Sequence, residues 1–434
     1  MSAVSVKLGD VVDFQTGFPF KSKDYSKDGR GLQLLRGDNI GQGFLRWDSA
    51  KYWPEPLAKE LSQYHLKEGD VVLAMDRPWI EAGLKYSAVS KDDLPSVLVQ
   101  RVTRFRETEK LSAGYLRYLI GSQGFTEHVH NISTGSVVPH ISGGNILEFE
   151  FELPSMEIQR EIAAILGALD DKIEVNRKTA TTLEEMARAL YRSWFVDFDP
   201  VHAKAAGRAP AHMDTQTAAL FPDSFGEDGL PEGWELGTLS DLIDFNPREK
   251  LQKGTLAPYL DMKALPTAGM SAGTPYDRAF TSGTKFRARD TLLARITPCL
   301  ENGKTAMVDD IGDAEIGWGS TEFIVMRAKD GVPPSLPYCV ARDASFREDA
   351  IASMTGSSGR QRADAKTIAA IEAAVPVEEI VVAFGEATMS MVEKIHQLGR
   401  ENQTLATLRD TLLPRLMSGE LRVGEAKKQV EAVA

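Results

Sequence analysis

The stretch KLGDVVDF at residues 7–14 returns later in the chain as TLSDLIDF at residues 238–245. Three further landmarks repeat in the same order and at a similar separation: GDVVLA (69–74) as RDTLLA (289–294), TGS (134–136) as TGS (355–357), and LP (153–154) as VP (375–376). Repeats this long are two similar domains rather than solenoid units, whose periods are about 20–50 residues. The sequence therefore predicts two similar modules, which could together read a two-part target.

The composition of the whole chain is that of an ordinary soluble globular protein. Its 434 residues are 42% hydrophobic and 26% charged, which leaves room for two or three domains that each bury a core. Two cysteines far apart, Cys299 and Cys339, exclude a disulfide framework and fit a reducing, cytoplasmic location. The N-terminus lacks the pattern of a signal peptide, and no apolar run is long enough to predict a membrane span.

The net charge is the main objection to a nucleic-acid-binding function. The chain carries a formal charge of −12, and acidic residues outnumber basic ones in both halves. A general nucleic-acid binder is expected to be basic. DNA binding would therefore need local basic patches, or affinity supplied by a partner.

Each module reads as an α+β fold. In the first, short β-like runs at residues 70–74 and 96–102 lie between Gly, Pro and Asp turn signals, and residues 115–120 form a helical patch. Residues 146–153 alternate apolar and acidic side chains over most of their length, as in a half-buried strand that Pro154 ends.

Two long helices follow the modules. Each carries a heptad-like seam with one irregular step at the same place, which is typical of a coiled-coil face. At ~1.5 Å per residue each helix would be roughly 55–60 Å long. The seam residues are Ile158, Ile162, Ile165, Leu169, Ile173, Asn176, Ala180, Leu183, Ala187, Leu190 and Trp194 in the first helix, and Ile380, Phe384, Ala387, Met391, Ile395, Leu398, Asn402, Leu405, Arg409, Leu412 and Leu416 in the second.

Two arrangements of these helices are open: antiparallel pairing along their length, or packing of each helix on its own module alone. Pairing is favoured, because forty residues of seam exceed what one small domain can cover. The predicted organisation is a module over 1–154, a helix over 155–199, an irregular linker over 200–230, a module over 231–376, a helix over 377–421 and a frayed tail over 422–434.

Several of these segments carry a family resemblance. LPSMEIQREI (153–162), LEEMA (183–187), YRSWF (191–195), LPRLMSGEL (413–421), GFPFKSKDY (17–25) and TGSVVPHI (134–141) together resemble the specificity subunits of type I restriction–modification systems. The second copy departs from the pattern: VPVEEI (375–380) lacks the glutamine that follows Ile158, and GSSGRQR (356–362) lacks the Pro-His of the first copy.

The resemblance implies a non-catalytic subunit with two target recognition domains, one for each half of a bipartite double-stranded DNA target. The paired helices would set the spacer and dock two modification (methyltransferase) subunits and the restriction (translocase and nuclease) subunits. S-adenosylmethionine, ATP and Mg²⁺ would then belong to the partners, and this chain would need no cofactor and no metal.

The sequence contains no motif that would indicate a catalytic site and so favour an enzyme instead. NPR (246–248) and VPPS (332–335) do not fit the Asn/Asp/Ser-Pro-Pro-aromatic motif of amino-methyltransferases. NGKT (302–305) resembles the end of a phosphate-binding loop, but Pro298 stands where that loop needs its first glycine. His128 and His130 lack further ligands at metal spacing, so a packing or solvated role is expected.

Arg, Lys and His residues are the candidate DNA contacts, because cations bind phosphates and Arg and Lys also read base edges. In the first module they are Arg30, Arg36, Arg46, Arg77, Lys85 and His140; in the second they are Lys285, Arg287, Arg289, Arg295, Lys304, Arg360 and Arg362. The loop with Arg360 and Arg362 is favoured, since Gly and Ser allow the backbone to approach phosphate.

The candidate surface for helix pairing or partner docking is Ile162, Leu169, Ile173, Leu183, Leu190, Trp194, Phe195, Met391, Ile395, Leu398, Leu405, Leu412 and Leu416. The aromatic cluster at Trp194 and Phe195 has two explanations, a core within this chain or one completed by a partner subunit. Two other functions stay open: a scaffold that binds only proteins, and a self-contained modification enzyme, which the missing motif disfavours.

Overall fold

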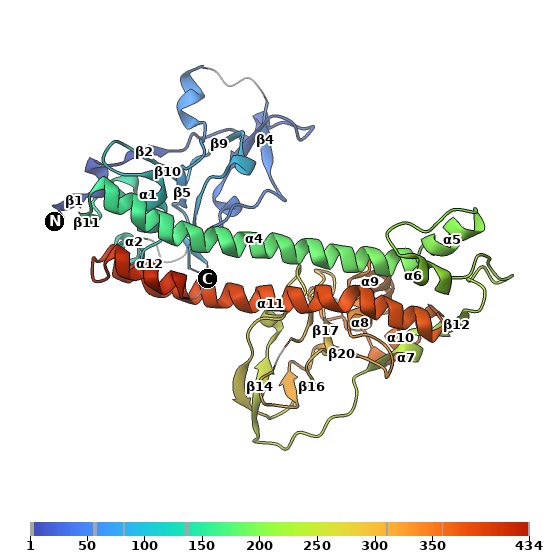
Figure 1. The fold of residues 1–434 in the computed structure, drawn as a ribbon. Coiled ribbons are helices and arrows are strands. Elements are labelled where there is room, and N and C mark those ends of the chain that lie inside the picture. The colour runs from blue at the N-terminus through green and yellow to red at the C-terminus, as the bar shows by residue number, and fades with distance from the viewer. Residues whose placement is uncertain are drawn as a thin grey trace. The chain divides into compact units, whose positions relative to one another are not determined.

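A computed structural model describes residues 4–54, 59–80, 83–134, 139–309, 311–357 and 359–432. Residues 135–138 of the TGSVVPHI segment and Ser358 of the GSSGRQR segment lie outside the described residues. The chain divides into two compact units (Figure 1): unit 1 is Met1–Ile173 with Thr404–Ala434, and unit 2 is Glu174–Gln403. The helices α4 (Met156–Phe195) and α11 (Glu378–Met417) contribute residues to both.

Unit 1 contains a module of small sheets covered by helices. Its main sheet has the strand order β2-β10-β5-β8, and a three-stranded sheet has the order β4-β3-β9. The strands are β1 (Val4–Lys7), β2 (Asp13–Thr16), β3 (Leu32–Leu35), β4 (Lys51–Trp53), β5 (Val71–Ala74), β6 (Trp79–Ile80), β7 (Gly83–Leu84), β8 (Tyr86–Ala88), β9 (Ser96–Leu98), β10 (Val102–Arg106) and β11 (Glu150–Leu153). The helices are α1 (Ala113–Ile120), α2 (Gln123–Ile132), α3 (Gly143–Leu147) and, at the end of the chain, α12 (Val423–Glu431).

Unit 2 repeats this topology. The sheet β13-β20-β17-β18 matches β2-β10-β5-β8, and the parallel pair β14–β19 matches β3–β9. The strands are β12 (Glu235–Thr238), β13 (Ile243–Phe245), β14 (Leu256–Leu260), β15 (Tyr276–Ala279), β16 (Thr284–Phe286), β17 (Thr291–Ala294), β18 (Thr305–Met307), β19 (Gly317–Gly319), β20 (Phe323–Ala328) and β21 (Glu372–Val375). The helices are α5 (Asp199–Ala205), α6 (Thr215–Leu220), α7 (Leu239–Leu242), α8 (Ser335–Arg342), α9 (Ala344–Ala352) and α10 (Ala365–Ala369). The internal duplication is thus present in three dimensions.

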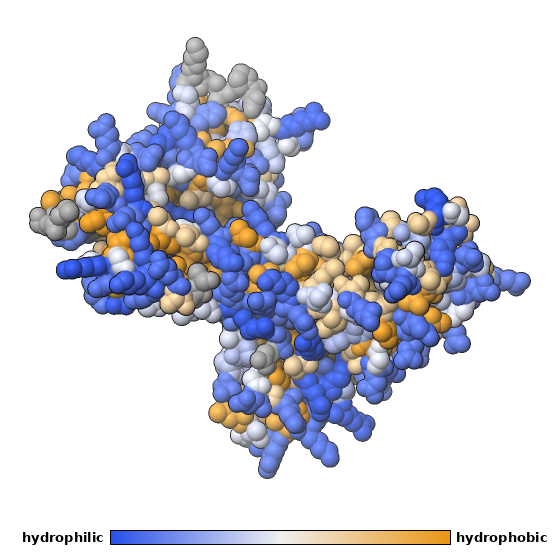
Figure 2. All heavy atoms as spheres, in the orientation of Figure 1, coloured by the Kyte–Doolittle hydropathy of each residue, from blue (hydrophilic) through white to orange (hydrophobic). Residues whose placement is uncertain are grey.

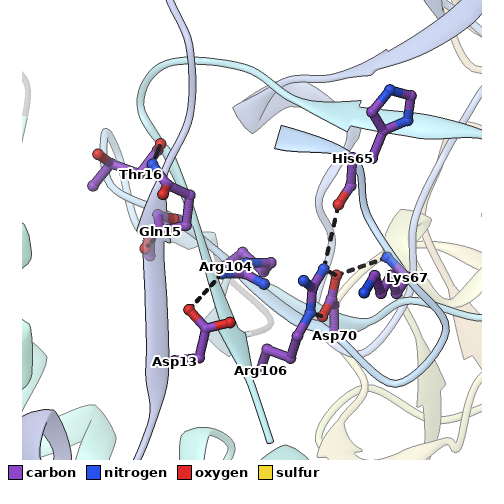
Figure 3. A network of polar contacts seen from close by, with 9 residues as sticks. Asp13, Gln15, Thr16, His65, Lys67, Asp70, Arg104 and Arg106 are labelled. Carbon is purple, nitrogen blue, oxygen red and sulfur yellow. Dashed lines mark hydrogen bonds and ion pairs between the residues drawn. The ribbon is translucent and has the colours of Figure 1, made fainter. Parts of the chain in front are cut away.

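An aspartate at the start of the central strand is held by an arginine of the neighbouring strand in both units. In unit 1, Arg106 at the end of β10 donates two hydrogen bonds to Asp70, at 2.6 and 2.8 Å, and Asp70 also accepts from the backbone N–H of Lys67 (Figure 3). Unit 2 has the same contacts between Arg327 and Asp290, at 2.7 and 2.7 Å. Because these aspartates are almost fully buried, the charge-assisted pairs hold together the ends of the two inner strands of each sheet.

A second arginine on β10 makes a different contact. Figure 3 shows Arg104 turned toward Asp13 of β2, and the guanidinium donates to this carboxylate at 2.8 Å. The side chain of Arg104 is nearly buried while that of Asp13 is about half exposed. Arg104 and Arg106 of β10 therefore bind carboxylates on different segments, Arg104 at β2 and Arg106 just before β5.

The long helices pair and also cover the modules. In unit 2, Asn176 of α4 donates to Asn402 of α11 at 3.0 Å, and the rings of Trp194 and Phe384 are 5.9 Å apart. Residue numbers rise along one helix as they fall along the other, so the segments are antiparallel. In unit 1, Arg409 of α11 binds Asp170 of α4 at 2.8 Å. The predicted helix pairing is confirmed within each unit, as are the mixed α and β fold with two similar modules.

The seam residues also enter the cores of the modules. Ile162 and Leu169 share the core of unit 1 with Tyr115, and Leu183 packs with Met307 in unit 2. The two arrangements left open by the sequence are therefore not exclusive, since one helix face serves both contacts.

Four local predictions from the sequence are wrong in part. The expected strand over 146–153 begins only at Glu150, because Ser142 caps α3 and Ile146 packs in the core as part of that helix. The run 96–102 breaks between β9 and β10, which belong to different sheets.

The other two corrections concern segments expected to be irregular. The tail contains α12, whose Ala426 is buried in the core of unit 1. The linker contains α5 and α6, and its Val201 and Phe221 are buried in the core of unit 2. Buried apolar anchors order both segments, although their composition is typical of loops.

Candidate nucleic-acid interface

The two modules share a loop junction at the end of their central strands. In unit 1, the N–H of Met75, just after β5, donates to the carbonyl of Arg101, and the N–H of Arg77 donates to Pro139. In unit 2, Arg295 donates in the same way to Glu322, and Thr297 to Gln361. We call these sites junction 1 (residues 74–77, 101 and 139–140) and junction 2 (residues 294–297, 322 and 361–362). Their backbone pattern aligns His140 with Arg362 and Arg101 with Glu322.

Junction 1 carries a histidine, an aspartate and an arginine in contact. The imidazole Nδ1 of His140 lies 2.6 Å from a carboxylate oxygen of Asp76, and Nε of Arg101 lies 3.5 Å from the other oxygen. The guanidinium of Arg101 is also 3.3 Å from the imidazole. The side chain of Arg101 is 58% exposed, so its remaining donors point toward solvent and can take an anionic or polar ligand.

Junction 2 has a permanent cation where junction 1 has histidine. Arg362 donates to both carboxylate oxygens of Glu322, at distances of 2.7 to 3.0 Å. The hydrogen bond and the charge of Glu322 raise the pKa of Arg362. Arg360 lies in the same loop, and its carbonyl accepts a hydrogen bond from Arg362. Two predicted DNA contacts are thus brought together, one of them held by a carboxylate.

Four other predicted residues of unit 1 form a basic cluster around one acidic residue. Arg36 binds the carboxylate of Asp38 at 2.5 Å, and Arg46 donates to the backbone carbonyl of Asp38 at 3.4 Å. Lys85 is partly buried close to these groups and to Arg77. Burial lowers the pKa of Lys85, the charge of Asp38 opposes this, and the charges of Arg46 and Arg77 add to it. We call Arg36, Arg46, Arg77 and Lys85 the first basic cluster.

Lys304 of unit 2 occupies the position of Lys85. The carbonyls of Lys85 and Lys304 accept from the N–H groups of Ala74 and Ala294, which end the matching strands β5 and β17. The ammonium of Lys304 donates to the carbonyl of Met262 at 2.8 Å. The two modules thus carry a lysine at the same position of this turn.

The remaining residues predicted to contact DNA bind other groups of the protein. Lys285 donates to the backbone carbonyl of Glu249, and Arg287 binds the Glu249 carboxylate at 2.6 Å. Arg289 lies 3.6 Å from Glu393 on α11. Arg30 stands in a separate turn, where its backbone N–H donates to Asp28. These four residues are not brought together with the junctions.

Residues that sequence reasoning missed complete both junctions. Asp76 comes just after β5, whereas Arg101 and Glu322 directly precede β10 and β20. All three are far in sequence from the loops they contact. Arg101 adopts a left-handed backbone conformation with φ of 70°, which is uncommon for a residue other than glycine. No local sequence pattern points to that conformation, so only the fold identifies this arginine.

The turn that resembled a phosphate loop has a structural explanation. Buried Arg342 donates to the carbonyls of Gly303 and Thr305, both at 2.9 Å, and its Nε lies 3.0 Å from the hydroxyl of Tyr338. The guanidinium therefore occupies the inner side of the turn. His130 stacks on Trp79 at 3.9 Å, and His128 binds the carbonyl of Asn145, in keeping with the expected packing roles.

The apolar candidates on the long helices are mostly in cores. The seam residues Ile162, Leu169, Ile173, Trp194, Ile395, Leu398, Leu405, Leu412 and Leu416 are buried, and Leu183, Leu190, Phe195 and Met391 are partly buried. Trp194 packs on Phe221 and Phe384 of this chain. The chain therefore supplies the core around Trp194 itself.

Comparisons with known proteins agree with this geometry. A family model described as the type I restriction modification DNA specificity domain matches residues 3–185. The MjaVIII specificity subunit of Methanocaldococcus jannaschii is 33% identical over 186 residues, which are 43% of each chain. The HindI specificity subunit of Haemophilus influenzae is 27% identical over 423 residues, covering 82% of this chain and 87% of that subunit.

A solved structure extends the fold comparison to nearly the whole chain. The type I restriction–modification S subunit from M. genitalium has a TM-score of 0.53 at 15% identity and covers 95% of this chain and 96% of its own. At that identity the likeness concerns the fold alone.

Two similar modules joined to paired helices define an internally duplicated architecture. The chain is similar over most of its length to specificity subunits of type I restriction–modification systems, and its first part matches the family model of their DNA specificity domain. The resemblance found in the repeated motifs is thereby confirmed.

Proposed function

We propose that this chain reads a bipartite double-stranded DNA sequence, one half with each module, and assembles modification and restriction subunits on it. The modules would be residues 1–154 and 231–376. The observation that carries the proposal is the repeated junction, which places a cationic or protonatable loop residue, His140 or Arg362, at the same position in both modules. A two-part target is the natural ligand of a duplicated site.

The acidic net charge is compatible with this function because the cations are concentrated locally. The first basic cluster gathers four cations and the Arg360–Arg362 loop two, while the chain as a whole carries a charge of −12. Phosphate contacts contribute most of nonspecific affinity. The isolated chain should accordingly bind DNA weakly, and specific binding should appear in the complex with its modification subunits.

Partner docking is proposed for the outward faces of the long helices. Val175 and Met186 of α4 and Val382 of α11 are exposed apolar side chains, and Figure 2 shows apolar patches among the hydrophilic residues around the end of α4 near α5 and α6. Exposed apolar patches rimmed by polar residues are typical of protein interfaces. Two modification subunits would bind there, with S-adenosylmethionine on those subunits and ATP and Mg²⁺ on the restriction subunits. The complex would act on DNA in the cytoplasm.

The test is to sequence methylated adenines in a host without its own adenine methylation. One strain expresses this chain with its modification subunit, and a control strain expresses the modification subunit alone. A split motif, with two short blocks around a fixed gap, should appear only with this chain. A motif that forms without the chain, or no motif at all, would contradict the proposal and favour a protein scaffold.

Residue variants then test the junctions. Arg360→Ala with Arg362→Ala should weaken binding of the complex to its target and reduce the slope of affinity against salt, by up to about one unit for each lost phosphate contact. Arg208→Ala, in the exposed segment after α5, is the matched control. Unchanged affinity and slope would remove this loop from the interface.

A further inference from the structure

An exposed phenylalanine stands at the tip of a tight turn beside the first basic cluster. The backbone N–H of Gly41 donates to the carbonyl of Phe44 at 3.0 Å, which closes the turn, and Ile40 pairs with Leu45. The side chain of Phe44 is 51% exposed. A single exposed apolar residue needs no explanation by itself, so its surroundings decide what it means.

The ring of Phe44 lies against the backbone of Gly41. A Cβ atom added at Gly41 would lie 2.5 to 2.8 Å from three ring atoms of Phe44, so only glycine lets the ring rest there. Gly43 has a φ of 82°, a left-handed conformation that favours glycine, and its N–H donates to the carbonyl of Tyr86 at 2.7 Å. The ring thus rests against Gly41 while its other side is exposed.

One cation of the first basic cluster lies beside this ring. The guanidinium carbon of Arg46 is 5.9 Å from the ring centroid of Phe44. Tyr86, which anchors the turn, directly follows Lys85 of the first basic cluster. An exposed apolar ring with a cation beside it and a basic cluster nearby is a combination with which proteins can insert a wedge between DNA base steps while binding the flanking phosphates.

The second module offers an internal comparison. Its corresponding turn over residues 265–273 contains no aromatic residue, and Met270 within it is buried in the core of unit 2. Arg342 binds the carbonyls of Thr267 and Gly269 in this turn. The turn of the second module is therefore packed against the protein through Met270 and Arg342 and has no exposed aromatic ring.

We propose that Phe44 inserts between two base pairs of the half-site read by the first module and unstacks them, whereas the other half-site stays stacked. This rests on the proposed function, and it adds sequence-dependent DNA deformation, at steps that unstack easily, to what the first module recognises.

The experiment uses the assembled methyltransferase complex and duplexes that carry the motif found by methylation sequencing. 2-Aminopurine replaces one base at a time in each half-site, except the methylated adenine, which a modification subunit would itself flip out. Wild-type complex should increase 2-aminopurine fluorescence severalfold at one step of the first half-site and at no step of the second.

Phe44→Ala should abolish that fluorescence increase and weaken target binding by roughly 5- to 150-fold, the range expected for losing one base–aromatic contact. Phe44→Leu, which keeps an apolar wedge, should retain most of the signal. Leu236→Ala, at an exposed apolar side chain of β12, is the matched control, and equal melting temperatures show that the variants are folded.

Two results would overturn the inference: a fluorescence increase that persists in Phe44→Ala, or no increase at any step with wild-type complex that methylates its motif. Loss of affinity on replacing thymine by uracil, without unstacking, would instead assign Phe44 to a contact with a thymine methyl group and also reject the wedge. Failure of the proposed function is distinguishable, because no bipartite motif would then exist on which to build the duplexes.

Discussion

Replacing Asp70 by Asn tests whether the repeated Asp–Arg pair holds each module together. The side chain of Asp70 is 1% exposed, and that of Arg106 is 22% exposed. Asn keeps the shape and one acceptor but removes the charge that two hydrogen bonds from Arg106 and one from the Lys67 backbone satisfy. Breaking a fully buried pair costs about 3–5 kcal/mol. Because Arg106 keeps partial access to water, we expect about 2–4 kcal/mol.

This loss converts into a measurable shift in melting temperature. For units of 150–250 residues, about 1 kcal/mol lowers the melting temperature by roughly 2–4 °C. Asp70→Asn should therefore lower the transition of unit 1 by roughly 4–16 °C in scanning calorimetry of the purified chain. Asp290→Asn should do the same to unit 2, whose Arg327 makes the matching contacts.

The control is Asp24→Asn, an exposed aspartate in the same unit, which should change stability by no more than about 0.5 kcal/mol. If Asp70→Asn melts like this control, the pair contributes little, and the argument from burial and bidentate geometry fails. A smaller effect in the double variant Asp70→Asn with Arg106→Gln than the sum of the single variants would locate the loss in the pair itself.

Three further predictions concern other contacts. Glu322→Gln should release Arg362 and strengthen target binding by the complex severalfold in a titration; weaker binding would show that Arg362 needs this partner for its orientation. Burial alone would raise the pKa of Glu249, but hydrogen bonds from two arginines outweigh it and lower the pKa. Its contribution is thus present above the unfolded-state pKa and lost as pH falls through the folded-state value. Glu249→Gln should therefore flatten the acid side of the melting profile of unit 2 below about pH 4.5, whereas an unchanged profile would refute this. At the helix pair, Asn176→Ala should destabilise unit 2 by about 1 kcal/mol, and changing both Asn176 and Asn402 to Leu should restore or raise its melting temperature; a further loss would contradict the reasoning.

The sequence alone predicts the features that depend on local periodicity and repetition. The duplicated modules follow from the paired landmarks at residues 7–14 and 238–245, and the long helices from their seams. Asn176 and Asn402, which interrupt the apolar seams, form a hydrogen bond to each other. Contacts along regular helices can be predicted from the sequence because the side-chain period of a helix is fixed.

The site is less accessible to prediction, because it is assembled from segments distant in sequence. Arg360 and Arg362 were favoured for their Gly- and Ser-containing loop, but the carboxylate of Glu322 that holds Arg362 is forty residues away. Arg287 and Arg289 are also candidate cations by sequence, yet they pair with Glu249 and Glu393. The charge of a residue is visible in the sequence, but its partner is set by tertiary packing.

The carboxylates at the junctions suggest why an acidic protein can serve a DNA-directed complex. If the junctions contact DNA as proposed, Arg362 exchanges Glu322 for a DNA group, and Arg101 exchanges Asp76. An exchange gains less free energy than binding by an unpaired cation, since the starting ion pair is lost. Nonspecific phosphates, which offer only charge, are then weak competitors for the guanidinium. A base edge that accepts two of its hydrogen bonds offsets the free energy lost with the ion pair. The pre-formed ion pairs would thereby reduce affinity for all DNA while preserving discrimination, and the modification subunits would supply the missing affinity.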